Sequence, residues 1–183
     1  EISACLVGSE MCIRDSNQDW SEVDLEAMPA DFIPATAYQS DRTAKPTYDA
    51  DYTVWKYGQI ANRARDFYRI AWRAQAATTG FRTVYPAILP PKSTHIHGVH
   101  SGANPASPSM TVLAGSVLSS FLIDFAQRST GIANMYGTAI EALPSPFDGP
   151  GSPAAERSTE LYLRLNCLTL SLIHISEPTR QAE

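Results

Sequence analysis

The sequence predicts an α+β domain, in which a small mixed or antiparallel sheet packs on a core helix and a further helix follows. Two segments, 68–73 and 81–89, have the composition of strands, and the segment 109–128 has an apolar stripe at steps of three and four. The chain has 183 residues, of which 44% are hydrophobic and 18% charged. This composition suits one globular domain and excludes a disordered acidic chain.

The strand predictions rest on alternation and on turn residues. In the segment 68–73 (YRIAWR), Ile70 and Trp72 alternate with Arg69 and Arg73, which predicts a strand with an apolar face and a half-exposed arginine face. The segment 81–89 (FRTVYPAIL) predicts a second strand. Pro86 lacks a backbone donor, so that strand must lie at an edge or bulge there. The segment 95–100 predicts a short third strand or loop, and 54–66 a short helix.

The helix predictions rest on caps and periodicity. Ser107 is predicted to be the N-cap of a helix over 109–128, with Pro108 in its first turn and Gly131 after its end. The members of its apolar stripe are Met110, Leu113, Val117, Phe121 and Phe125. A stripe this broad predicts a core element. The segment 145–153 (SPFDGPGSP) reads as a linker, and another helix begins at 154.

The two ends of the chain are related in an unusual way. The segment 170–180 (LSLIHISEPTR) can be encoded by DNA whose complementary strand, read one base out of frame, encodes the segment 6–15 (LVGSEMCIRD). Both resemble the translation of a transposon-type sequencing-library adapter. We therefore expect residues 1–16 and 170–183 to derive from an adapter, and residues 17–169 to be an internal part of a longer natural protein.

Charge divides this natural part in two. Residues 17–51 carry eight acidic side chains against Arg42 and Lys45, and we interpret them as an acidic peripheral arm. Residues 52–169 carry ten basic against six acidic side chains, a net charge of +4, which favours weak affinity for a polyanion. Cys167, the one cysteine in the natural part, suits the reducing cytoplasm and no disulfide. No apolar run approaches the roughly 20 residues that cross a bilayer, so we expect no membrane partner.

The basic and histidine residues are the candidates for chemistry. Arg69, Arg73, Arg82 and Lys92 can form one basic face, although a solvated strand face explains them equally well. His95, His97 and His100 have a spacing that can ligate a metal, but no Asp, Glu or Cys lies near them in the sequence. We therefore expect no metal site, and histidines that make ordinary hydrogen bonds or contact phosphate and bases.

Catalytic motifs are not found in the sequence. Ser101 and Ser116 lack the Gly-x-Ser-x-Gly context of a serine hydrolase. Asn104-Pro105 is followed by Ala106 and Ser107, which departs from the Asn-Pro-Pro-aromatic motif of amino-methyltransferases, and there is no glycine-rich cofactor loop. We predict no catalytic residue and no cofactor in this chain.

Five segments occur in a recognisable order. They are YRIAWR at 68–73, RTVYPAILPP at 82–91, FLIDFAQR at 121–128, ALPSP at 142–146 and LRLNCLT at 163–169. This succession resembles the target-recognition region of large bacterial adenine-N6 DNA methyltransferases of restriction-modification and phage-defence systems. The resemblance covers about 52–169, and assigns 52–153 to the recognition domain and 154–169 to the start of a following helix.

The resemblance implies that this region reads double-stranded DNA, while a missing upstream module binds S-adenosylmethionine and carries out catalysis. Contacts would come from the two predicted strands and from the loop 92–104. The candidate DNA-binding residues are Arg69, Arg73, Arg82, Lys92, Thr94, His95, His97, His100 and Asn104. Two alternatives stay open: a fragment of a metal-dependent hydrolase with a histidine loop, and a protein-interaction module.

Overall fold

The structure is a computed structural model that describes residues 24, 27, 29–31, 45–76, 81–95 and 97–167. Helices and antiparallel strands both build it, so the fold class is α+β, as the sequence predicts. The two adapter-like segments and most of the acidic arm lie outside the described residues. Helix α3 (Lys45–Asp51), at the C-terminal end of the arm, is described.

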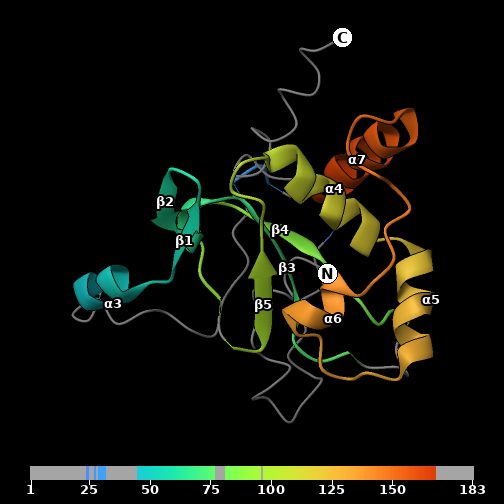
Figure 1. Cartoon of the computed structure of the whole chain (residues 1–183), viewed down its shortest axis with the longest axis horizontal. Helices are drawn as coiled ribbons and strands as arrows, with labels where there is room; N and C mark the ends of the chain where they lie inside the picture. Colours follow the sequence, from blue (N-terminus) through green and yellow to red (C-terminus); the bar gives the residue numbers. More distant parts are fainter. Residues whose placement is uncertain are drawn as a thin grey trace.

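A three-stranded antiparallel sheet forms the centre of the domain (Figure 1). Strand β3 (Arg69–Arg73) lies between β4 (Ala87–Leu89) and β5 (Val99–Gly102). The predicted second strand is shorter than expected, because regular pairing begins only after Pro86, which has no N–H to donate. Its predicted position at a sheet edge is confirmed. The segment that contains His100 is the third strand.

The side chains of β3 alternate between two buried faces. Ile70 and Trp72 point into the main core together with Ile88 of β4. Ala71 and Leu89 belong to a second, smaller buried cluster on the other face. The predicted alternation is therefore correct, but the prediction of a half-exposed arginine face is wrong, because Arg69 is only 1% exposed. The sequence pattern indicates where a side chain points and not what covers it.

The predicted helix 109–128 is two helices, α4 (Pro108–Leu118) and α5 (Phe121–Thr130), which are bent by 66° relative to each other. The break is at Ser119 and Ser120, where the Ser120 hydroxyl accepts a hydrogen bond from the N–H of Ile123 and so caps α5. The bend leaves Phe121 and Phe125 exposed, at 81% and 71%. The prediction that these two side chains lie in the core is wrong.

The predicted ends of this helical region are confirmed. The Ser107 hydroxyl caps α4 by accepting from the N–H of Met110, and Pro108 is in its first turn. Gly131 ends α5 in the left-handed conformation with φ +66°. After it, Met135 donates its N–H to the carbonyl of Ala74 beyond β3 and leads into the short helix α6 (Gly137–Glu141).

Helix α7 (Pro153–Asn166) packs against α4. Gly115 of α4 is the point of closest approach. A Cβ atom at this position would come within 2.6 Å of Ile70 Cδ1 on β3 and of Tyr162 Cε1 on α7. Tyr162 and Leu163 are both 3% exposed in the main core. The helix that we expected to begin a following element therefore helps to bury the sheet.

Residues 54–63 form a β-hairpin, so the prediction of a helix here is wrong. Strands β1 (Val54–Tyr57) and β2 (Ile60–Arg63) pair in antiparallel register, with Tyr57 opposite Ile60 and Val54 opposite Arg63. Gly58, at φ +56°, allows the two-residue turn between them. Neither strand joins the three-stranded sheet, and the hairpin lies to one side of it (Figure 1).

In the described part of the chain, no single helix is long and apolar enough to cross a membrane. Helices α4 and α5 pass that test of length and composition only when taken together as a bent pair.

Candidate nucleic-acid interface

Arg69 lies beneath the surface at the start of β3. Its Nη1 donates to the Tyr52 hydroxyl and to Ser101 Oγ, both at 3.4 Å, and its Nη2 donates to the Ser93 carbonyl at 2.5 Å. His95 Nε2 is 2.8 Å from the same Ser101 Oγ. Two of the predicted site residues, Arg69 and His95, are therefore brought together around Ser101.

Arg73 is half-buried at the other end of β3, and its guanidinium lies 6.0 Å from the centre of the Tyr85 ring. This distance is within the range of a cation–π contact. Arg73 is thus separated from Arg69 along the strand, and the two do not present one continuous basic surface.

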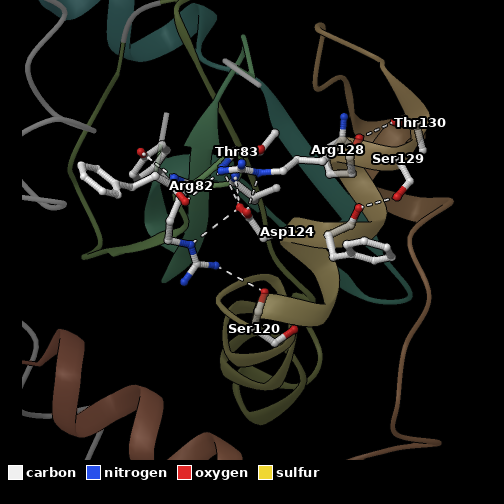
Figure 2. A network of polar contacts seen from close by, with 12 residues as sticks. Arg82, Thr83, Ser120, Asp124, Arg128, Ser129 and Thr130 are labelled. Atoms are coloured by element: carbon white, nitrogen blue, oxygen red, sulfur yellow. Dashed lines mark hydrogen bonds and ion pairs between the residues drawn. The ribbon is translucent and has the colours of Figure 1, made fainter. Parts of the chain in front are cut away.

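Arg82 belongs to a buried network around Asp124 on α5 (Figure 2). Asp124 Oδ1 accepts from the N–H of Thr83 at 2.6 Å and of Val84 at 3.1 Å, and Oδ2 accepts from Arg128 Nε at 3.1 Å. Arg82 Nε is 3.7 Å from Oδ1. The charge of Arg82 is therefore directed at a carboxylate of its own domain.

The electrostatics of this network favour the ionised form of Asp124. Burial alone would raise the pKa of this carboxyl, but the two backbone donors, followed by Arg82 and Arg128, lower it below its ordinary value of 3.8. Arg82 also donates to the Ser120 carbonyl at 3.3 Å and lies over the Phe121 ring. Its role is to fix the loop before β4 on α5.

Lys92 is exposed and forms an ion pair with Asp66, the last residue of the 3-10 turn η1 (Ala64–Asp66). The hydrogen bond from Lys92 is the main cause that lowers the pKa of Asp66. Lys92 has φ +70°, a left-handed conformation that is uncommon for a side chain of this kind. Its backbone N–H donates to the Arg65 carbonyl, which holds the loop against η1.

The three histidines do not converge on one point. The His97 and His100 rings lie 5.9 Å apart edge to face, and His100 also contacts the rings of Trp72 and Tyr136. Burial, and then the neighbouring His97, lower the pKa of His100, so its neutral form is favoured. Because His100 and Ser101 are adjacent on β5, they point to opposite faces of the sheet, and His95 accompanies Ser101.

A metal site would need three such ligands. Among the residues that the structure describes, no group of three His, Cys, Asp or Glu side chains is arranged to hold a metal ion.

Asn104 has a local structural role before α4. Its Oδ1 accepts from the N–H groups of Ala106 and Ser107, at 3.0 and 3.2 Å, which shapes the turn that leads into the helix. Thr94, in contrast, is exposed on the loop before β5. Of this pair, Thr94 is the residue whose side chain faces solvent.

One exposed basic surface is not among the predicted site residues. On the β1–β2 hairpin, Lys56 and Arg63 are both exposed and lie diagonally across the two strands on the same face. Within the described residues, neither side chain forms an ion pair. Val54, Trp55 and Tyr57 are residue types that favour strands, and Gly58 follows them directly. This composition, together with the glycine turn, is the signal that could have revealed the hairpin.

The other face of the hairpin attaches it to the domain. Trp55 stacks on Phe67 with their ring centres 6.0 Å apart, and Ala64 donates its N–H to the Thr53 carbonyl. The hairpin is therefore anchored at its base and along one side, while Lys56, Arg63 and the exposed Tyr57 remain available for contact.

No protein-family model matches this chain, and no curated protein and no solved structure matches it.

Proposed function

We propose that this domain binds double-stranded DNA as the sequence-recognition module of a cytoplasmic adenine-N6 DNA methyltransferase of the restriction-modification or phage-defence type. The S-adenosylmethionine site and the catalytic residues would be supplied by an upstream module outside this chain. The order of the five sequence segments supports this assignment to a protein class.

The β1–β2 hairpin is the observation that carries the proposal. A two-stranded ribbon has dimensions that the major groove of DNA admits. Exposed Lys and Arg side chains on such a ribbon can contact phosphates or the acceptor atoms of guanine. Such contacts are easier when the side chain does not first have to break an ion pair with a carboxylate of its own protein. Lys56 and Arg63 meet these conditions within the described residues.

The proposed DNA-binding surface differs from the one that the sequence predicts, because several of the predicted residues make contacts within the domain. Arg69 and Asn104 are engaged in internal contacts, and Arg82 is directed at Asp124. Thr94 and His97 are exposed on the loop before β5 and remain candidates for contact. The proposed interface therefore combines the outer face of the hairpin with this loop.

A DNA titration tests the proposal. Fluorescence anisotropy with labelled duplexes of randomised sequence measures the dissociation constant at several KCl concentrations. We expect the wild-type affinity to fall steeply with salt, with a slope of about −0.9 for each phosphate contacted. The double variant Lys56→Gln/Arg63→Gln should reduce the magnitude of this slope by about one to two units.

The matched control is Arg157→Gln/Arg164→Gln. It makes the same change in net charge on α7, where both arginines are exposed and paired with Glu160. It should leave the salt slope nearly unchanged. An equal effect of both double variants would mean that only net charge matters, and that the hairpin is not the interface.

Protein docking is the second candidate function. It is favoured by Phe121, Leu122 and Phe125, which are exposed along α5. A wild-type chain that shows no salt-dependent affinity for any duplex would reject the DNA proposal and favour this one.

A further inference from the structure

We propose that the polar cluster at the start of β3 binds an oxyanion, namely a phosphate group, through the guanidinium of Arg69. The members of this Arg69 cluster are Tyr52, Arg69, Ser93, His95 and Ser101. The inference does not depend on the DNA-binding proposal, because it follows from the contacts of Arg69 itself.

The charge of Arg69 is buried without a counter-charge in the part of the chain that the structure describes. Its side chain is among the largest that are fully buried, and its three hydrogen-bond partners are two hydroxyls and one carbonyl, all neutral. Buried charges in proteins are normally paired, because transfer of an unpaired ion from water is costly. An anionic ligand would supply the missing charge.

The hydrogen-bonding capacity of Arg69 is also incompletely used. Its Nε is buried and has no hydrogen-bond partner among the described residues. The two bonds from Nη1 are 3.4 Å long, well beyond the usual 2.9 Å for this kind of bond. Nε and a terminal nitrogen together form the planar fork that binds two oxygens of a phosphate or carboxylate.

The surrounding charges favour an anion. Arg65 lies over the Tyr52 ring, with its guanidinium carbon 5.5 Å from the ring centre, and Lys92 is on the adjoining loop. Together with Arg69 they make three cations, whereas Asp66, the carboxylate among them, is bound by Lys92. Among the residues that the structure describes, positive charges near the guanidinium of Arg69 therefore outnumber negative ones.

The residues around Arg69 lie close to the surface and differ in their polar groups. Tyr52, Ser93, His95 and Ser101 are all half-buried, so the cluster reaches the surface although Arg69 does not. The Ser101 hydroxyl accepts from Arg69 Nη1 and still carries a proton of its own that it can donate. A tetrahedral phosphate can accept from all of these donors, whereas a planar carboxylate would use the fork alone.

Thermal unfolding of the full chain with inorganic phosphate tests the inference. Chloride at matched ionic strength is the reference. At a phosphate concentration about ten times the dissociation constant, the wild-type melting temperature should rise by about 3–6 °C. Arg69→Met should abolish this shift, and Ser101→Ala, which removes only one hydroxyl, should reduce it even if the Arg69 variant does not fold.

Arg73→Met is the control, because Arg73 lies on the same face of the same strand four residues away. It should keep the full phosphate shift. No shift in the wild type would overturn the inference, and so would an equal shift in the wild type, Ser101→Ala and Arg73→Met.

A competition experiment distinguishes two sources of the phosphate. If the cluster takes a backbone phosphate of DNA, inorganic phosphate should displace a labelled duplex more effectively than chloride, and Ser101→Ala should weaken duplex binding. If it takes a small phosphorylated molecule, the same variant should lose the phosphate shift and leave duplex binding unchanged. A wild type that responds to phosphate but binds no duplex would reject the DNA proposal and support the phosphate site.

Discussion

Asp124 joins two parts of the chain that are about forty residues apart. Its carboxylate binds the backbone of Thr83 and Val84 in the loop before β4 and the side chain of Arg128 on its own helix. Because these partners all donate hydrogen bonds or carry positive charge, they favour the ionised form of Asp124 at a buried position. One carboxylate thus holds the loop 81–84 against α5.

The substitution Asp124→Asn, which makes this side chain neutral, should lower the free energy of unfolding by about 1–3 kcal/mol at pH 7, since hydrogen bonds to a charged group are lost. Urea denaturation measures the change. The control Glu141→Gln, at an exposed position on α6, should change stability by less than about 0.5 kcal/mol.

The stabilities of the wild type and of Asp124→Asn should also depend differently on pH. The pKa of Asp124 is lower in the folded chain than its ordinary value of 3.8, so its ionisation stabilises the fold above pH 3.8. That contribution is lost as pH falls from 3.8 through the folded pKa. The difference in stability between wild type and Asp124→Asn should narrow over this acidic range, and a constant difference would contradict the assignment.

The residue types of the site were visible in the sequence, but their roles were not. Alternation in 68–73 placed Arg69 correctly opposite Ile70 and Trp72, and yet Arg69 is buried. Its burial depends on Tyr52, Ser93 and Ser101, which come from three other segments of the chain. Periodicity describes one element at a time and cannot show which distant segments cover it.

At the scale of elements, the contact between α4, α7 and β3 depends on the absence of a side chain at Gly115. Alanine is normally the better helix former by about 0.8–1.0 kcal/mol. Here a methyl group would meet Ile70 and Tyr162 at distances that real contacts do not reach. Both neighbours are buried, so they have little room to move aside.

We therefore expect Gly115→Ala to lower the free energy of unfolding by about 1–3 kcal/mol through overpacking. Gly137→Ala on α6 is the matched control, because nothing lies within 4 Å of a Cβ atom at that position. That variant should be neutral or slightly stabilising. Urea denaturation of the two variants and the wild type checks this expectation, and a stabilised Gly115→Ala would contradict the packing described.

The two incorrect predictions of elements, one long helix over 109–128 and a helix over 54–66, have local causes. The apolar repeat continues in sequence through Ser119 and Ser120, although the backbone bends there and α5 begins anew with its own cap. A repeat records spacing, so it does not detect a change in helix direction. The four-residue strands β1 and β2 are likewise too short for the strand period of apolar residues to be distinguished from the helical period.

For the whole molecule, α7 belongs to the same folded unit as the sheet. Ala155, Tyr162 and Leu163 of this helix are almost completely buried, and Tyr162 joins the core that contains Ile70 and Trp72. Burial of a large apolar side chain such as Leu163 stabilises a fold by about 1.5–3 kcal/mol. A domain boundary placed at residue 153 from the linker composition would separate this helix from the core that it covers.

A chain that stops before Pro153 should therefore lose cooperative unfolding and near-ultraviolet circular dichroism, because the side of α4 that carries Gly115 would be exposed. A chain that stops after residue 169 should keep both. Retention of a sharp thermal transition in the shorter chain would show that α7 is dispensable.

The way the β1–β2 hairpin is attached also affects how the sequence of this domain can evolve. Its outer face, with Lys56, Ala61 and Arg63, is exposed, whereas its anchor is the Trp55–Phe67 stack. Replacements on such a face change the free energy of unfolding by no more than about 0.5 kcal/mol. Mutations that alter what the ribbon recognises can thus accumulate without first requiring compensation in the core, so binding preference is free to diverge while the scaffold is inherited intact.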